Sequence, residues 1–374
     1  VDSARHILEK ATAPEYKTVD DLAAVYCAWA EMELRCAEQE EGGDAAEAYQ
    51  RALIVMQEAT AEPGAEVRRR RALQGKDELM LIPVKERIHK SVKVWTLYLD
   101  LEESLGTHET CQAAYDRVLE LRIATPQIIL NYAAFLSESH YYEASFTVFE
   151  RGIHIFKWPH VKPLWHAYLD AFTARYGGSK LERARELMEQ ALSKAPAEAS
   201  TELYIKYAKL EEDHGLVRHA MAIYDRACKH VKNKKDMYLL YIKKAESFYG
   251  VTRTREIYEA SIAALPDNLA QKMSLEYAGM ERKLGEVDRA RGIFTHGAQL
   301  SNPKREPGYW KAWHDFEVAH GNEDTFKDML RVKRSVSVSY ASETSLRDMA
   351  TGDLPVQSDA EAVAAMKDTG GGGG

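Results

Sequence analysis

The chain has 374 residues, 45% of them hydrophobic, which supports a folded core and excludes wholesale disorder. Its formal charge of −8 comes from 58 acids and 50 bases spread along the chain, so a dedicated polyanion-binding domain is not expected. No apolar run approaches the roughly 20 residues that span a bilayer, and no secretory leader opens the chain, so we expect a soluble, non-secreted protein. The four cysteines form no CxxC pair, which predicts buried thiols in a reducing compartment.

The first segment, residues 1–61, is predicted to hold the first repeats of a helical array. It opens with ARHILEKA from Ala4, which has the pattern of the second helix of a two-helix repeat. A first helix from Tyr26 and a second helix containing EAYQRAL from Glu47 follow. Because the first repeat is partial, we interpret the chain as a fragment of a longer polypeptide.

The second segment, residues 62–91, departs from the repeat and is predicted to be an insertion of roughly one extra helix pair. It contains the densest basic run, Arg68, Arg69, Arg70 and Arg71. Such a run could contact RNA phosphates or act as a nuclear-import signal. The alternative is a solvated helix or loop whose arginines pair with nearby acids such as Glu62 and Asp77.

The third segment, residues 92–340, repeats one helical frame. In WTLYLDLEESLG, Trp95, Tyr98 and Glu102 fall at i, i+3 and i+7, on one face of a helix that ends at Gly106. Copies of this frame start at Ile129, Trp165, Tyr204 (with Tyr207), Tyr238, Ser274 and Trp310 (with Trp313).

A second pattern follows each frame, with a small residue, an apolar and aromatic pair, and often a final proline. Its aromatic position, which includes Tyr224 and Tyr258, recurs about every 35 residues, except for one interval of 66 residues from Tyr49 to Tyr115. Small residues let paired helices approach, and the aromatic rings fill the groove between them. We predict an all-α fold, an α-α superhelix (solenoid) of antiparallel helix pairs. Unrelated helices in a compact all-α domain would need the frame to recur by chance.

The last predicted helix runs from about Asn322, a plausible N-cap, to Tyr340. Its second half carries Arg331, Lys333 and Arg334, which could face a partner or RNA. We expect this helix mainly to cap the array, because a terminal repeat needs a polar outer surface. Residues 341–374 lose the frame and are predicted to be a flexible tail.

Recognisable catalytic chemistry is absent from the sequence. The main nucleotide, zinc and hydrolase signatures are missing, and we predict no catalytic, cofactor-binding or metal-binding residue. Carboxylates recur at one position of the frame, which indicates a structural role in every repeat and predicts bonds or ion pairs with the neighbouring helix. They are Glu102, Glu211, Glu281 and Glu317.

The repeat resembles the half-a-tetratricopeptide (HAT) repeat of RNA-processing proteins. More specific strings, such as ARYGGSKLERAR from Ala174, YGVTRTREIY from Tyr249 and HGNEDTFKDMLRVKRSV from His320, resemble the XPA-binding protein 2 family, called Syf one in yeast. The resemblance runs in order from about Val1 to Tyr340 and covers only the later repeats of that family. The residues after Tyr340 match nothing that we recognise.

The resemblance implies a non-catalytic scaffold in the nucleus, within the Prp19-associated, intron-binding part of the spliceosome. It implies a role in pre-mRNA splicing, and the family's animal members are also linked to transcription-coupled DNA repair. The implied partners are an aquarius-type helicase, an Isy-type factor, a cyclophilin and a crooked-neck-type HAT protein, with RNA as a further candidate within the assembly. No membrane, small-molecule substrate or cofactor is implied.

Two alternative functions stay open on the sequence. One is a direct RNA-binding module that uses the Arg68–Arg71 run and the basic part of the last helix, against which the negative net charge argues. The other is a HAT-repeat scaffold of another RNA-processing complex, against which the specific strings argue. Affinity purification of the full-length protein would separate these alternatives.

Overall fold

The computed structural model describes residues 2–39, 43–65, 67, 69 and 83–351. Within these residues every regular element is a helix and no strand is present, which confirms the predicted all-α class. None of the helices in these ranges is long and apolar enough to cross a membrane. The chain divides into two compact units, residues 1–194 and 195–374.

Unit 1 consists of helices that alternate between the first and second helix of successive pairs. Its elements are α1 (Asp2–Thr12), α2 (Val19–Gln39), α3 (Gly43–Thr60), α5 (Val84–Arg87), η2 (Ile88–Lys90), α6 (Val92–Leu105), α7 (His108–Glu120), α8 (Pro126–Glu138), α9 (Tyr142–Ile155), α10 (Lys162–Tyr176) and α11 (Leu181–Lys194).

Unit 2 continues the same alternation. Its elements are α12 (Ala197–His214), α13 (Val217–His230), α14 (Lys234–Tyr249), η3 (Val251–Arg253), α15 (Thr254–Ala264), α16 (Asp267–Lys283), α17 (Val287–Ala298), α18 (Pro307–His320) and α19 (Glu323–Thr351).

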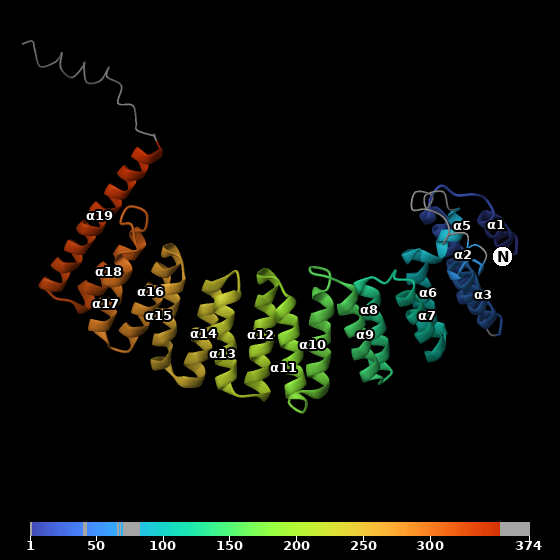
Figure 1. The fold of residues 1–374 in the computed structure, drawn as a ribbon, viewed down its shortest axis with the longest axis horizontal. Helices are drawn as coiled ribbons and strands as arrows, with labels where there is room; N and C mark the ends of the chain where they lie inside the picture. Colours follow the sequence, from blue (N-terminus) through green and yellow to red (C-terminus); the bar gives the residue numbers. More distant parts are fainter. Residues whose placement is uncertain (1, 40–42, 66, 68, 70–82, 352–374) are drawn as a thin grey trace, which may run out of the picture. The chain divides into compact units, whose positions relative to one another are not determined.

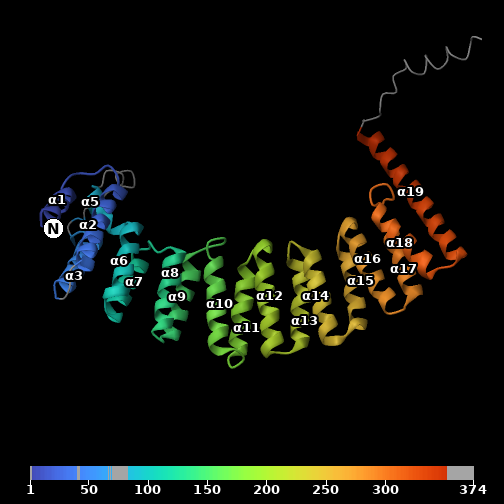
Figure 2. The ribbon, with the colours of Figure 1, turned by 180° about the vertical axis from the view of Figure 1, so that it is seen from behind.

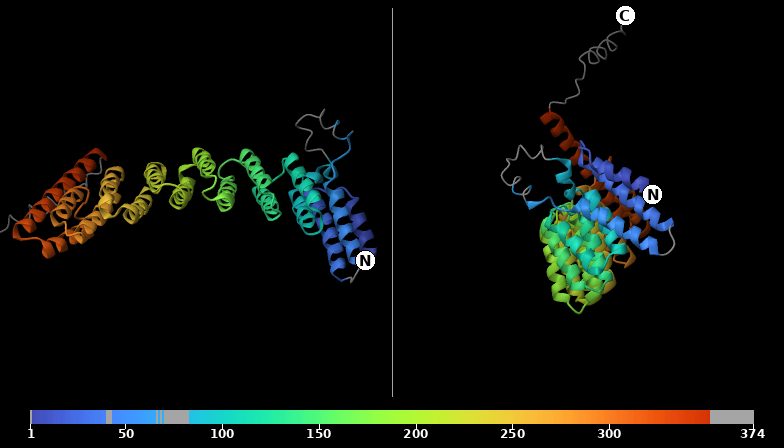
Figure 3. Two further views of the ribbon diagram at one scale, coloured as in Figure 1. Left: turned by 90° about the horizontal axis from the view of Figure 1, so that it is seen from below. Right: turned by 90° about the vertical axis from the view of Figure 1, so that its right-hand side faces the viewer.

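Within each unit, consecutive helices run antiparallel and pack side by side, as two opposite views show (Figures 1 and 2). The most extensive contacts join the helices of one pair, for example α2 with α3, α12 with α13, and α16 with α17. Further contacts join some helices that are two apart in the chain, such as α8 with α10 and α16 with α18, so the helices of each unit lie in two layers (Figure 3). This is the arrangement of an α-solenoid, in which each pair buries its apolar face against its neighbours.

Local sequence explains where these helices begin and end. Thr107 caps α7 in a capping box with Thr110, and Asn322 caps α19 by accepting hydrogen bonds from the backbone of Asp324 and Thr325. The helix α6 ends at Gly106, where a Cβ atom would lie 2.3 Å from the carboxylate of Glu102. The glycine therefore leaves room for the buried glutamate four residues earlier.

The last helix differs in detail from the prediction, and part of the predicted insertion lies outside the described residues. The helix α3 packs against α6, and the described part of residues 62–91 includes α5 and η2. The apolar face of α6, with Val94, Trp95 and Leu99 buried, is what favours the packing of α3 on α6. The helix α19 continues past the predicted end at Tyr340 to Thr351, because no glycine or proline interrupts it before residue 352.

Candidate functional site

Several junctions between one helix pair and the next contain two facing aromatic rings. We call the contact between the second helix of one pair and the first helix of the next pair a seam. In the α15–α16 seam, the rings of Tyr258 and Tyr277 have centroids 4.9 Å apart and planes 2° apart. Such pairs add about 0.5–1.5 kcal/mol beyond the burial of the rings. The corresponding pairs are Tyr115–Tyr132, Phe149–Tyr168, Tyr224–Tyr241 and Phe294–Trp313.

A buried residue lies in every first helix, seven positions after the start of the frame. In several helices it is a glutamate whose exposed fraction is 3% or less, namely Glu33, Glu102, Glu211, Glu281 and Glu317. In α8, α10 and α14 the same position holds an apolar side chain, namely Leu136, Phe172 and Ala245. The position is therefore buried whether its side chain is charged or apolar.

An arginine from the preceding second helix neutralises the glutamate in two seams of unit 2. The Nε and Nη2 atoms of Arg255 on α15 donate to the two carboxylate oxygens of Glu281 on α16, at 2.6 Å and 2.8 Å. Arg291 of α17 donates to Glu317 of α18 at 3.0 Å, and the Trp313 indole donates to the same carboxylate at 3.1 Å. The predicted ion pair with a neighbouring helix is confirmed for these two glutamates. Glutamate buried without such a partner would be strongly unfavourable.

Glu33, which the sequence analysis did not single out, forms the corresponding site in unit 1. Its carboxylate accepts from Arg5 of α1 at 2.8 Å and 2.9 Å, and from Arg51 of α3 at 3.3 Å. Burial alone raises the pKa of Glu33, but the hydrogen bonds and charges of both arginines outweigh it and hold the pKa below the ordinary value of 4.5. Its position in the frame from Tyr26 was the signal that could have identified it.

The other two predicted glutamates also have polar neighbours. Glu211 lies 3.7 Å from the imidazole of His219 on the following helix α13. Burial is the main cause that raises the pKa of Tyr98, and the nearby carboxylate of Glu102 is the second. The Tyr98 phenol and the Glu102 carboxylate therefore lie close together on α6. These two carboxylates thus also lie among polar partners.

An aromatic cluster replaces the ion pair in the α9–α10 seam of unit 1. Phe146 of α9 occupies the place of the arginine, and its ring centroid is 5.4 Å from that of Phe172 in the place of the glutamate. Tyr168 and Tyr176 of α10 also contact Phe146, at 5.8 Å and 5.9 Å. This seam therefore has no charge at its buried position.

The remaining predicted packing residues lie inside the helix layers. The indoles of Trp95 and Trp310 donate to the backbone carbonyls of His89 and Ser301, at 2.8 Å and 3.1 Å. The rings of Tyr204 and Tyr207 lie 5.5 Å and 6.0 Å from the guanidinium of Arg226 on α13. All of these aromatic residues are buried.

The predicted basic contacts are only partly described by the structure. Arg68, Arg70 and Arg71 lie outside the described residues, and Arg69 is exposed. Glu62, proposed as a partner of that run, forms an ion pair with Arg117 of α7 at 2.5 Å.

The three predicted basic residues of α19 lie within the described part of the chain. Arg331 forms an exposed ion pair with Asp328 at 3.0 Å, and Lys333 lies 6.0 Å from the ring of Trp310. The guanidinium of Arg334 donates to the backbone carbonyl of Leu330 in its own helix. A role of these residues in binding RNA or protein stays a prediction.

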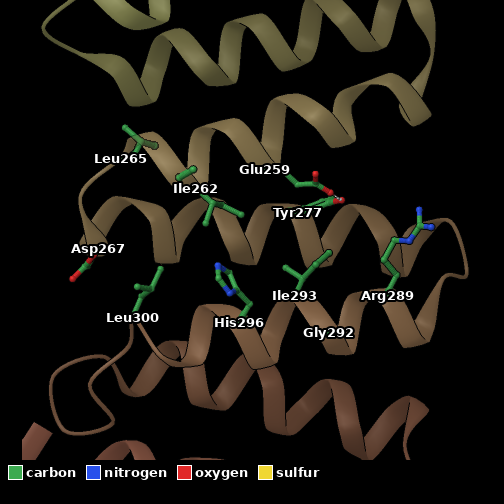
Figure 4. A pocket seen from close by; sticks show the side chains of 11 residues that line it. Glu259, Ile262, Leu265, Asp267, Tyr277, Arg289, Gly292, Ile293, His296 and Leu300 are labelled. Carbon is green, nitrogen blue, oxygen red and sulfur yellow. Dashed lines mark hydrogen bonds between the residues drawn. The ribbon is translucent and has the colours of Figure 1, made fainter. Parts of the chain in front are cut away.

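A groove in unit 2 lies between the second helices α15 and α17 (Figure 4). It has a volume of about 720 Å³, and Tyr277 of α16 reaches it between the two helices. Glu259 accepts a hydrogen bond from the Tyr277 hydroxyl at 3.2 Å. The apolar lining comes from Ile262, Ala263, Leu265, Ile293 and Leu300, and the polar rim from Asp267, Arg289 and His296. Such a mixed lining suits a protein segment.

Titratable groups in the described residues show no metal-binding arrangement. No cluster of three or more histidine, cysteine or acidic side chains that could hold a metal is found there. Cys27, Cys111 and Cys228 are buried free thiols, as predicted, and Cys36 is half-buried. Burial first, and nearby carboxylates second, raise the pKa of Cys111 and Cys228 to about 12, so neither thiol is activated.

Stacked helix pairs joined by the same buried residues define a helical-repeat protein of the α-solenoid class. A family described as the pre-mRNA-splicing factor Syf1/CRNKL1 C-terminal HAT repeat matches residues 1–370. The chain belongs to this family.

Several curated proteins are similar to the chain. It is 49% identical over 362 residues to the human pre-mRNA-splicing factor SYF1, covering 96% of this chain and 40% of that protein. It is 48% identical over 348 residues to the Drosophila melanogaster syf1 homolog, covering 92% and 37%, and 42% identical over 351 residues to Schizosaccharomyces pombe cwf3, covering 92% and 42%. The chain thus spans about two fifths of the length of these relatives.

Proposed function

We propose that this chain is part of a non-catalytic scaffold that acts in pre-mRNA splicing in the nucleus. The observation that carries the proposal is repetition, because the buried aromatic pair recurs from seam to seam and the buried carboxylate in several of them. An enzyme needs one convergent set of reactive groups, whereas a solenoid needs the same packing groups in each unit. The similarity to proteins named pre-mRNA-splicing factors supports splicing as the process.

The proposed partners are other spliceosomal proteins. By resemblance they include an aquarius-type helicase, an Isy-type factor, a cyclophilin and a crooked-neck-type protein. The groove between α15 and α17 supports a protein contact, because it combines an apolar lining with charged groups of both signs on its rim. Stacked repeats present such grooves along an extended surface.

Blocking that groove in the full-length protein tests the proposal. Gly292 lies in the groove with open space around the position of a Cβ atom, so Gly292→Phe should fold normally and fill the groove. In a splicing extract depleted of the endogenous protein, the wild type should restore splicing and Gly292→Phe should restore it less. Gly308→Phe, at another open glycine outside the groove, is the matched control. Failure of the wild-type protein to restore splicing would refute the proposal.

A further inference from the structure

A second pocket in unit 2 lies between the first helices α14 and α16, next to the α15–α16 seam. Its volume is about 410 Å³. The carboxylates of Glu246 and Glu276 and the buried phenol of Tyr258 line it. Val251, Leu275, Gly279, Met280 and Leu284 supply the rest of the wall, and Lys283 is also part of the lining.

The preceding seam of the same chain shows what this arrangement normally holds. In the α13–α14 seam, the Tyr224 hydroxyl donates to Glu212 at 2.9 Å, and the ammonium of Lys244 binds the other oxygen of Glu212 at 2.5 Å. The carboxylate is nearly buried, with 8% of its side chain exposed, so the lysine compensates a largely desolvated charge. Glutamate, tyrosine and lysine together fill that seam.

The α15–α16 seam keeps two members of this set and lacks the third. In the aligned repeats, Glu246 takes the place of Glu212 and Tyr258 takes the place of Tyr224, but Met280 takes the place of Lys244. Glu276 adds a second carboxylate, where the preceding repeat has Leu240. The position of Lys244 is therefore apolar in this seam, and one carboxylate has been added.

Within the described residues, neither carboxylate of this pocket is paired with a cation. Tyr258 is buried, with an exposed fraction of 7%. Its hydroxyl forms no hydrogen bond with the described residues. Burial first, then the carboxylates of Glu276 and Glu246, raise the pKa of Tyr258 to about 12, which places its hydroxyl close to both acids. Lys283 is exposed, stands where the preceding repeat has Ser247, and forms no ion pair with either acid in the described part of the chain.

We propose that this pocket binds a lysine or arginine side chain of a partner protein, which takes the place that Lys244 occupies in the preceding seam. The two carboxylates and the phenol match the charge and the hydrogen-bond donors of such a side chain. The apolar wall matches its methylene stem and the apolar residues beside it in the partner. This inference rests on the proposed scaffold function and specifies the chemistry of one of its contacts.

A peptide titration on the full chain tests the proposal independently of splicing. The probes are a short blocked peptide with arginine between two leucines and the same peptide with citrulline, which keeps the shape and removes the charge. The readout is the NMR signal of the Met280 methyl group. The arginine peptide should bind with a dissociation constant on the order of 1 mM and at least about tenfold more tightly than the citrulline peptide. Binding should weaken as salt is raised.

Two variants assign the binding to the pocket. Met280→Lys restores the lysine of the preceding repeat and should abolish binding of the arginine peptide. Because this variant lacks the Met280 methyl group, the NMR signals of the Tyr258 ring serve as its readout. Glu276→Gln, which leaves the fold unchanged at an exposed position, should weaken binding of the arginine peptide about tenfold. Asn268→Lys adds the same charge at the other end of α16 and should bind like the wild type. Equal binding of the two peptides, or unchanged binding by Met280→Lys, would overturn the proposal.

Discussion

The α15–α16 seam and the α9–α10 seam solve the same packing problem with opposite chemistry. The first buries Glu281 against the Arg255 fork, whereas the second places Phe172 and Phe146 at the corresponding positions. Both positions are almost inaccessible to water, with 0% of Glu281 and 5% of Phe172 exposed. The repeat therefore fixes the burial and the shape of this position, and the partner across the seam decides whether it is charged.

In the α15–α16, α17–α18 and α9–α10 seams, the two facing residues match each other. An arginine in the second helix accompanies glutamate in the next first helix, as for Arg255 and Glu281 or Arg291 and Glu317. Phenylalanine accompanies phenylalanine in the other seam. Physical necessity explains the match, because a buried charge without its partner costs far more than either matched pair.

The largest expected effect comes from the aromatic seam. Phe172→Ala should destabilise the packing of α9 and α10 by about 4 kcal/mol, because it removes a buried ring and leaves a cavity beside Phe146. Hydrogen exchange of the amides in these two helices measures the loss. Ile155→Ala, at a position 51% exposed, should change the same amides by less than about 0.5 kcal/mol. Equal effects of both changes would contradict the account.

The charged seam should be most sensitive to loss of its arginine. Arg255→Met leaves the Glu281 carboxylate buried without a partner and should cost about 3 kcal/mol, measured by hydrogen exchange in α15 and α16. The matched control is Glu256→Gln, which removes an exposed ion pair with Arg253 and should cost less than about 0.5 kcal/mol. A cost for Arg255→Met as small as that of the control would show that the buried pair is unimportant.

The two kinds of seam should be interconvertible. Adding Glu281→Leu to Arg255→Met removes the stranded charge, so the double variant should return to within about 1 kcal/mol of the wild type. A double-mutant cycle on the same amides measures this recovery. If the two changes are simply additive, the residues do not act as a pair.

The smallest effect should follow a change of pH in the Glu33 site. Its pKa is lower in the folded chain than the ordinary value of 4.5, so this site stabilises the fold above that pH. The stabilisation should be lost as the pH falls below about 4.5 through the lower pKa of the folded state. Exchange of the α1, α2 and α3 amides at pH 7 and below pH 4 measures it. Glu33→Gln should show less pH dependence, and an unchanged dependence would assign the effect to other acids.

The all-α solenoid could be predicted because its determinants are local and repeated. Trp95, Tyr98 and Glu102 fall on one helical face, and the same spacing returns in each first helix. The cap at Asn322 could likewise be read from the residue type and its position before an acidic turn.

What the sequence did not indicate depends on contacts between distant residues. The partners of Glu281 and Glu317 lie 26 residues earlier, and that constant spacing was a usable signal once both residues were aligned by repeat. The packing of α3 on α6 joins helices that are far apart in the sequence, which no local pattern determines. The pocket beside Tyr258 arises from one replacement, Met280 for lysine, that matters only when neighbouring repeats are compared in space.

Affinity purification of the full-length protein from nuclear extract, with quantitative mass spectrometry, tests the scaffold role most directly. We expect spliceosomal proteins to be enriched with the wild type, and we expect Gly292→Phe to lose a subset of them while Gly308→Phe keeps all. Recovery of no splicing proteins with the wild-type protein would contradict the scaffold role.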